Sequence, residues 1–422
     1  MTSFYFINRS FALLWLGQAL AIFGEFLVGA TVGVWLVNAL LEHDAQLPLA
    51  LGLTAAASTV PRILVAPLAG VWVDNARPVR VMVWADASRI LVTLLFMVIY
   101  CWGQLTPWQT LYSVCAVLLV NSTASQFFGP ARAGLMQQTI PEHRRIEASS
   151  KSMFSLSCVA IASAALAPLL YSAFGALPAF ALAIVGLCSS IGCVVATRES
   201  AARIRINARE ESYWQSLAEG VGLAWHHRRI RLMMIGTALY GVSLGINNPV
   251  LPLFGMQTLK LSPARYGVLM AALPVGGMCA TLLSARLGRR FKAETLSCGG
   301  LLLMGLANLG YGLSEGFYEP MLAMFVSGLF FSVYVVAQAP VLQAHVPAGY
   351  MGRISSLTSP VLSISSLLAT ALVTSALSRA AGSGFDPNAA ALAVSALIVM
   401  VGAALMLRGL MTVSFPERKV YE

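Results

Sequence analysis

Long apolar stretches alternate with short polar ones along almost the whole chain. A helix needs roughly 20 apolar residues to cross a bilayer, and twelve stretches meet this length. They cover residues 11–40, 49–73, 81–102, 108–136, 146–174, 177–197, 230–258, 263–287, 295–314, 320–345, 354–377 and 388–411. The pattern predicts an all-α integral membrane protein with twelve transmembrane helices. The one long polar interruption, 198–231, separates six helices from six.

Composition supports a membrane protein and excludes several other classes. Apolar residues make up 58% of the chain and charged residues only 10%, whereas a soluble domain carries about 25% charged residues. The seven cysteines show no CxxC spacing, so neither a disulfide framework nor a zinc site is predicted. We find no nucleophile–base pair and no Walker sequence, so we expect neither an enzyme nor ATP as the energy source.

Basic residues predict the orientation of the helices. Of the 27 lysines and arginines, only Lys260, Arg265 and Arg379 fall in the loops that we assign to the outside. The positive-inside rule then places both termini in the cytoplasm. We attribute the net charge of +10 to this topology and to contact with anionic lipid, not to nucleic acid.

The polar interruption and the two sets of helices define four parts of the chain. We expect an N-terminal six-helix bundle (1–197), a cytoplasmic linker (198–229), a C-terminal six-helix bundle (230–411) and a cytoplasmic tail (412–422). Apolar residues recur at helical spacing from Trp214 to Trp225, which predicts an amphipathic helix on the membrane surface. We interpret this helix as a tether between the bundles, with a regulatory role as the alternative.

The two halves of the sequence show traces of an internal repeat. Residues 137–141 (QQTIP) end the fourth stretch, and residues 343–347 (QAHVP) end the tenth. Arg145-Ile146 and Arg353-Ile354 follow at nearly the same offset. Duplicated six-helix halves are typical of transporters, with the substrate site between them near the middle of the bilayer. The sequence therefore predicts two pseudo-symmetric bundles around a central cavity.

Several short motifs carry a resemblance to a known family. Residues 70–80 (GVWVDNARPVR) resemble the signature G-x-x-x-D-R-x-G-R-R/K of the major facilitator superfamily, with Asn75 and Pro78 departing from it. The segments FALLWLGQ (11–18), Gly24-Glu25, ADASR (85–89) and FFGPAR (127–132) are similar to drug:proton antiporters that include macrolide efflux proteins and enterobactin-type siderophore exporters. Where this branch usually has glycine-proline in the fifth stretch, this chain has Ala167-Pro168. The resemblance implies a monomeric transporter of the bacterial inner membrane.

Charged residues near the expected cytoplasmic ends predict a gate. Asp74 ends a helix, where an arginine from a neighbouring helix can pair with it and separate again as the bundles rock. Setting the topology is the alternative role for this loop. We assign six residues to the gate: Asp74, Arg77, Arg80, Asp86, Arg89 and Arg132. For Arg89, simply ending its helix is an equal alternative.

Two charges are placed deeper in the membrane. An ionisable residue at that depth costs about 2.5–3.5 kcal/mol and normally faces a cavity and has a partner. Glu25 lies near the middle of the first stretch and Arg62 at a similar depth in the second. We predict that Glu25 exchanges a proton during transport, with a purely structural role as the alternative. For Arg62 two roles stay open, neutralising Glu25 or binding an anionic group of the substrate.

The second half carries uncharged polar groups instead. Asn247, Asn248 and Gln338 offer hydrogen bonds to a substrate, beside the rings of Tyr240 and Tyr334. We expect the sequence Asn247-Asn248-Pro249 to break its helix locally, because broken helices line cavities. For Asn308 we favour a hydrogen bond between helices over ligand binding.

Together these features predict a secondary active transporter without a cofactor, driven by the proton gradient. The favoured function is proton-coupled export of an organic molecule, such as a drug, a siderophore or another metabolite. The alternatives are proton-coupled uptake by a symporter and a lipid or lysolipid flippase.

Overall fold

The computed structural model describes residues 7–74, 76–140, 144–197, 222, 225–345, 351–380 and 386–411. In these ranges the chain is helical and contains no strand. Each of the twelve predicted apolar stretches corresponds to a helix or to two consecutive helical segments. Ten of these spans are long and apolar enough to cross a membrane, and α10 and α11 are the two outside that set. The predicted helix at 214–225 lies almost wholly outside the described residues.

The first half supplies seven α-helical segments. They are α1 (Arg9–Trp35), continued by the π-helix η1 (Leu36–Leu40), α2 (Leu47–Leu64), α3 (Ala66–Asp74), α4 (Pro78–Trp102), α5 (Pro107–Thr139), α6 (Arg145–Phe174) and α7 (Leu177–Val195). Local chemistry explains several boundaries. Asn8 caps α1 by accepting the Phe11 backbone N–H at 2.6 Å, Thr106 forms a capping box at α5, and α6 ends at Gly175, whose φ of 78° suits glycine.

Within the described ranges, the second half supplies six α-helices. They are α9 (Arg228–Leu253), continued by the π-helix η3 (Phe254–Thr258), α10 (Pro263–Arg290), α11 (Ala293–Gly312), α12 (Tyr318–His345), α13 (Met351–Ala380) and α14 (Pro387–Met411). Proline opens α4, α5, α10 and α14, where its fixed φ suits a helix and its missing N–H costs nothing.

The chain divides into two compact units. The first unit comprises residues 1–210, 255–271 and 374–381, and the second comprises 211–254, 272–373 and 382–422. Two short segments of the C-terminal half therefore belong to the first unit, a feature that the sequence did not indicate.

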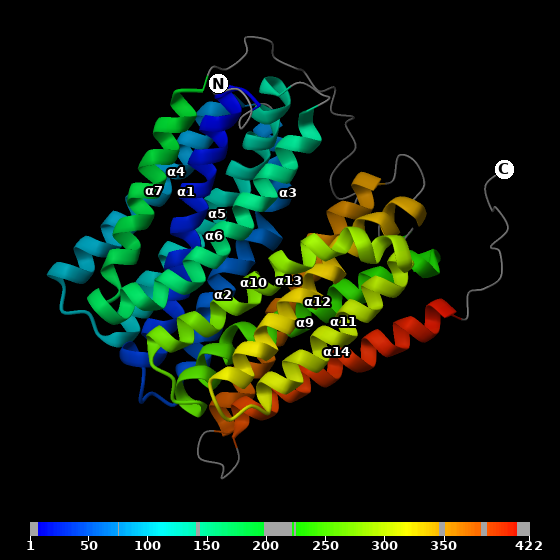
Figure 1. Cartoon of the computed structure of the whole chain (residues 1–422). Helices are drawn as coiled ribbons and strands as arrows, with labels where there is room; N and C mark the ends of the chain where they lie inside the picture. Colours follow the sequence, from blue (N-terminus) through cyan, green and yellow to red (C-terminus); the bar gives the residue numbers. More distant parts are fainter. Residues whose placement is uncertain are drawn as a thin grey trace. The chain divides into compact units, whose positions relative to one another are not determined.

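In the first unit α1 packs mainly against α6 and α7 and lies among α4, α5, α6 and α7 (Figure 1). Glycine permits the close approach of α1 to α7. A Cβ added to Gly24 would lie 2.6 Å from the Ala183 Cα, and one added to Gly186 would lie 2.6 Å from the Leu20 carbonyl oxygen. Such small residues let helix backbones meet, which is how helices pack in membranes. The residue after Gly24 is Glu25, so this contact fixes its depth beside α7.

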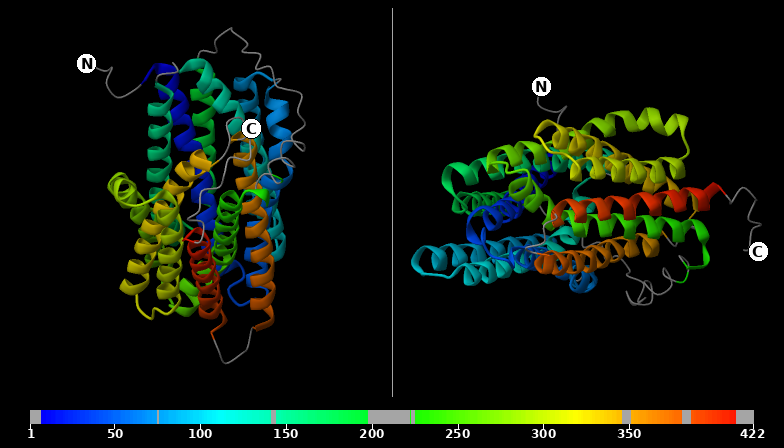
Figure 2. Two further views of the ribbon diagram at one scale, coloured as in Figure 1. Left: turned by 90° about the vertical axis from the view of Figure 1, so that its right-hand side faces the viewer. Right: turned by 90° about the horizontal axis from the view of Figure 1, so that it is seen from below.

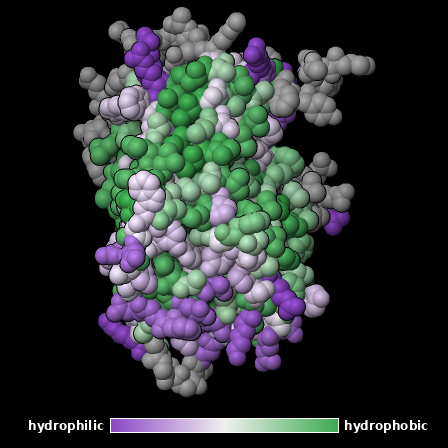
Figure 3. Space-filling view, turned by 90° about the vertical axis from the view of Figure 1, so that its left-hand side faces the viewer, coloured by the Kyte–Doolittle hydropathy of each residue, from purple (hydrophilic) through white to green (hydrophobic). Residues whose placement is uncertain are grey.

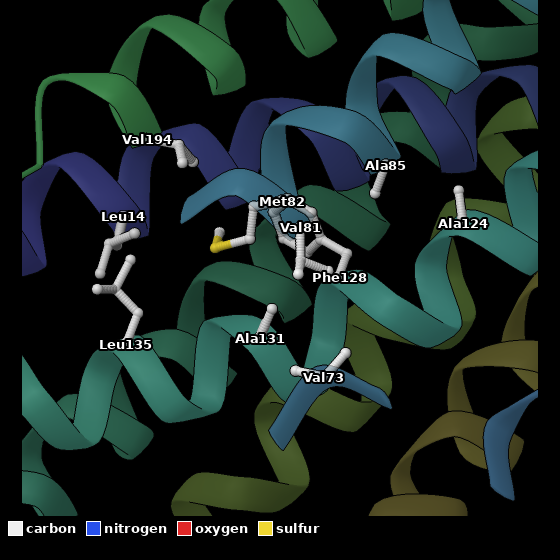
Figure 4. Close-up of a cluster of buried hydrophobic side chains, with 10 residues drawn as sticks. All are labelled: Leu14, Val73, Val81, Met82, Ala85, Ala124, Phe128, Ala131, Leu135 and Val194. Atoms are coloured by element: carbon white, nitrogen blue, oxygen red, sulfur yellow. The ribbon is translucent and has the colours of Figure 1, made fainter. Parts of the chain in front are cut away.

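The core of the first unit joins α1, α3, α4, α5 and α7. Its buried side chains are apolar and include Leu14, Val81, Met82, Phe128 and Leu135 (Figure 4). In the second unit α11 packs against α12 and α14, and α14 runs beside α9 (Figure 2). Apolar side chains cover much of the face shown in Figure 3, with hydrophilic ones gathered at its lower end. An apolar exterior is what a chain surrounded by lipid requires.

Candidate functional site

Glu25, Asp86 and Arg89 form a charged cluster inside the first unit. The Arg89 Nη2 donates a short hydrogen bond to Glu25 Oε2 and so joins α4 to α1. Asp86 and Arg89 are three residues apart and share one face of α4, and Arg89 Nη1 lies 3.6 Å from Asp86 Oδ1. One arginine is therefore placed between two carboxylates that come from different helices.

The two carboxylates differ in their surroundings. The Glu25 side chain is 30% exposed, whereas the side chains of Arg89 and Asp86 are 4% and 0% exposed. Asp86 makes its long contact with Arg89 and has the buried Ser190 hydroxyl of α7 as a further polar neighbour. Of the two acids, Glu25 is thus the more exposed, and Asp86 is buried in the protein.

Arg62 does not neutralise Glu25, so that alternative from the sequence is wrong. It lies exposed in the last turn of α2, and no ion pair is recorded for it in the described part of the chain. The helix is interrupted at Val65, because Pro67 lacks the N–H that would bond the carbonyl four residues earlier. The sequence put Glu25 and Arg62 at similar depths, but equal depth does not make two helices neighbours.

The predicted gate residues do not form one network. Arg89 turns toward Glu25 with Asp86 beside it, and Arg132 donates to the Ser152 hydroxyl of α6 at 3.0 Å. Arg77 and Arg80 are exposed at the start of α4, and the Asp74 side chain lies outside the described residues. The expected association of Asp86 and Arg89 with Arg132 is therefore wrong for this structure.

Three of the predicted cavity residues of the second unit lie together. The Gln338 amide nitrogen donates a short hydrogen bond to the Tyr334 hydroxyl and lies 3.5 Å from Thr237 Oγ1. The Tyr240 ring lies 5.9 Å from that of Tyr334 and stacks at 4.9 Å on Phe331. Tyr334 is 2% exposed, while Gln338 and Tyr240 are partly buried. This cluster from α9 and α12 is uncharged.

The expected helix break at Asn247-Asn248-Pro249 is wrong. α9 continues as an α-helix through Pro249 and Pro252, and the change to a π-helix comes only at Phe254. Pro249 leaves the carbonyl of Gly245, four residues earlier, without its usual donor. The Thr370 hydroxyl of α13 supplies one at 2.7 Å. A neighbouring helix thus satisfies the freed backbone group, which is how membrane helices tolerate proline.

The asparagines of the second half have different surroundings. Asn247 donates to the Ser243 hydroxyl at 3.3 Å, one turn earlier, and Asn248 is exposed. The predicted role of Asn308 is confirmed, because its Oδ1 accepts from the Ser327 hydroxyl at 2.8 Å and so joins α11 to α12. Sequence reasoning missed Thr370 and Ser152, since a hydroxyl on a helix gives no signal of which neighbour it faces.

Comparison with known proteins gives a consistent result. A family model described as Major Facilitator Superfamily matches residues 14–370. Macrolide efflux protein A of Streptococcus pyogenes is 23% identical over 357 residues, which cover 84% of this chain and 86% of that protein. The protein of the same name from Enterococcus faecalis is 23% identical over 308 residues, covering 72% and 94%.

Two solved structures show the same fold. A mutant form of the nucleoside transporter NupG superposes with a TM-score of 0.75 at 13% identity, over 95% of this chain and 100% of that one. A bacterial homologue of the iron transporter ferroportin, in an inward-facing state, gives a TM-score of 0.72 at 15% identity, covering 95% and 98%.

Proposed function

The chain belongs to the major facilitator superfamily, and we propose that it is a secondary active transporter that exports an organic molecule in exchange for protons. The observation that carries the proton coupling is the cluster of Glu25, Arg89 and Asp86. The likeness to macrolide efflux proteins supports export. The inner membrane of a bacterium, cytoplasmic termini and a monomeric state belong to the same proposal.

Protonation of Glu25 changes the charge balance of the cluster and therefore the position of Arg89. An arginine keeps its proton in a protein, so the cluster carries a charge of −1 when both acids are ionised and is neutral with one proton. A buried charge without a partner costs several kcal/mol. When Glu25 takes up a proton, the guanidinium of Arg89 therefore needs another anion, and Asp86 is 3.6 Å away. Arg89 then moves from Glu25 on α1 toward Asp86 on its own helix.

This shift loosens the link between α1 and α4. Glu25 is the more exposed acid of the pair, so it receives or releases the proton, while Asp86 stays ionised to hold Arg89. A ligand that binds one state of such a two-state element better than the other shifts its population. We propose that the substrate binds better to the state in which Glu25 is ionised, on one side of the membrane. Protons stabilise the state in which Glu25 is protonated.

The uncharged groups of the second unit supply the substrate contacts in this proposal. Gln338 and Tyr240 present amide and aromatic surface, and Asn248 is an exposed polar group of α9. Partly buried aromatic and amide groups are suited to a fairly large, mostly apolar organic molecule. Macrolides and other amphipathic drugs are therefore the first substrates to test, followed by siderophores.

Transport into proteoliposomes tests the proposal. We expect an imposed pH gradient to drive a radiolabelled macrolide against the proton flow, and Glu25→Gln to reduce this movement to the rate without a gradient. Exchange of labelled for unlabelled macrolide without a gradient should persist in Glu25→Gln. The matched control is Glu315→Gln, which neutralises an exposed glutamate of the second unit and should leave gradient-driven transport unchanged.

Three outcomes would contradict the proposal. Equal gradient-driven rates for the native protein and Glu25→Gln would remove Glu25 as the coupling site. Movement of the macrolide in the direction of the proton flow would show a symporter. Translocation of a fluorescent lysolipid that is independent of the gradient, without macrolide transport, would show a flippase.

A further inference from the structure

A groove lies between α3, α4 and α5 of the first unit, apart from the charged cluster. Its volume is about 600 Å³, within the range of about 300–1,000 Å³ typical of small-molecule sites. Val81, Ala85 and Ala124 form its floor and belong to the packed core of the unit (Figure 4). The groove is therefore a fixed feature of three packed helices and does not depend on a loop.

The open side of the groove faces outward. Trp72 and Trp84 line it and are 59% and 76% exposed, and Leu68 is 65% exposed. Trp72 meets the Phe127 ring edge-on at 5.7 Å and so closes one wall. Large exposed apolar side chains on a chain that spans a membrane contact lipid, and tryptophan is enriched at the interface between lipid and water. The groove thus opens to the bilayer.

The lining offers few hydrogen-bonding groups to an occupant. Its two hydroxyl side chains already use their hydrogens inside their own helices. Ser88 donates to the Ala85 carbonyl at 2.8 Å, and Thr123 donates to the Leu119 carbonyl at 2.7 Å. The surface of the groove is mostly apolar. Such a lining suits a hydrocarbon chain, because a polar occupant would lose most of its hydrogen bonds with water without replacement.

One end of the groove carries positive charge. On α4 the lining residues Val81 and Trp84 each have an arginine four positions earlier, Arg77 and Arg80. Residues four apart lie on the same face of a helix, about 6 Å apart along the axis. Both arginines are exposed at the start of α4. Arg80 therefore lies on the face of α4 that lines the groove, and Arg77 directly precedes the first residue of α4. Two exposed arginines thus lie next to one end of the apolar groove.

We propose that this groove binds an anionic phospholipid, with one acyl chain between α3, α4 and α5 and the phosphate on Arg77 and Arg80. Arginine matches phosphate because its planar group donates two parallel hydrogen bonds. The two features have to act together, since the groove alone accepts any acyl chain and the arginines alone attract any anion. Together they select a lipid with a negatively charged headgroup, and this assignment is independent of what the protein transports.

Native mass spectrometry of the delipidated full chain tests the site. Dioleoyl phosphatidylglycerol and dioleoyl phosphatidylcholine have the same acyl chains and differ in headgroup charge. We expect one phosphatidylglycerol molecule to remain bound in preference to phosphatidylcholine. Arg77→Gln with Arg80→Gln should reduce phosphatidylglycerol binding to the level of phosphatidylcholine. Thr123→Phe, which fills the groove, should reduce the binding of both lipids.

Two control variants match these changes. Arg265→Gln removes an exposed arginine at the start of α10, and Ser172→Phe adds a ring on the exposed face of α6, where the Ser172 hydroxyl also bonds within its own helix. Neither should alter lipid binding. A second measurement locates the lipid, because tail-brominated phosphatidylglycerol quenches nearby tryptophan. Native protein should lose more fluorescence than Trp84→Phe.

Three results would overturn the assignment. Equal retention of the two lipids would show that the arginines do not select a headgroup. Loss of phosphatidylglycerol in the arginine variant with unchanged binding in Thr123→Phe would show a headgroup contact without an acyl chain in the groove. Equal quenching in native protein and Trp84→Phe would place the lipid elsewhere.

Discussion

The two units place very different chemistry inside the membrane. In the first, Glu25, Asp86 and Arg89 form an ionic cluster that joins α1 and α4, and Arg132 bonds to α6. In the second, two contacts between helices are neutral, Asn308 with Ser327 and Thr370 with the Gly245 carbonyl. The cluster of the first unit consists of ionisable groups. The two neutral contacts of the second unit consist of amide, hydroxyl and carbonyl groups.

This difference separates two tasks that a coupled transporter must perform. In the proposed function, the ionic cluster with its one partly exposed acid would bind the proton. The neutral groups of the second unit would bind the substrate.

Removal of the shared arginine should have the largest effect. Arg89→Met leaves Asp86 buried and without its cation, and breaking a buried ion pair from one side costs about 3–5 kcal/mol. We expect a large loss of thermal stability in detergent, measured by fluorescence-detected size-exclusion chromatography after heating. Arg62→Met removes an exposed arginine of the same unit and should change the stability much less.

A second substitution, at Asp86, tests the cause of this loss of stability. Adding Asp86→Asn to Arg89→Met removes the uncompensated charge, so the double variant should recover part of the lost stability. Equal losses for Arg89→Met and Arg62→Met, or no recovery in the double variant, would show that the cluster does not behave as a buried ion pair.

The neutral contact at Gly245 should give a smaller effect. Thr370→Val removes the donor of a carbonyl that Pro249 has freed, and an unsatisfied buried polar group costs about 1–3 kcal/mol. Pro249→Ala restores the backbone N–H within α9, so Thr370→Val should cost less in that background. Thermal melting of the four proteins of this double-mutant cycle measures the coupling. Additive effects would show that the hydroxyl and the proline act independently.

Sequence alone predicted much of this fold but little of its side-chain pairing. The apolar stretches gave the helices to within a few residues, because a membrane helix must be apolar along its whole length. The depth of Glu25 was equally accessible, since it follows from position within the stretch. The partner of Glu25 could not be predicted from the sequence. α1 packs against α6 and α7 and is joined to α4 by Arg89, whereas the arginine predicted at equal depth, Arg62, lies on α2. Neighbours along the chain need not be neighbours in space.

The partner of the backbone carbonyl that Pro249 frees in α9 was also not predictable from the sequence. The sequence shows that Pro249 frees the Gly245 carbonyl, but not that Thr370 lies opposite it on α13. Local rules therefore predicted a broken helix where packing preserves a continuous one. The same holds for Asn308. The sequence predicted that this residue forms a hydrogen bond between helices, but it did not identify Ser327 as the partner. The sequence does not show how each helix is rotated about its axis. Because an α-helix has 3.6 residues per turn, an error of one position turns a side chain toward a different neighbour.

The smallest effect on stability, and the sharpest contrast between the units, is expected at Gln338. Gln338→Leu removes the amide that bonds Tyr334 and should cost only about 1 kcal/mol. In the proposed function it should raise the KM for a macrolide in proteoliposomes while leaving the pH dependence of transport unchanged. Glu25→Gln should do the reverse, flattening the pH dependence with a smaller change in KM. A Gln338→Leu protein with an altered pH profile would mean that the neutral cluster also responds to protons, and the two units would then share one task.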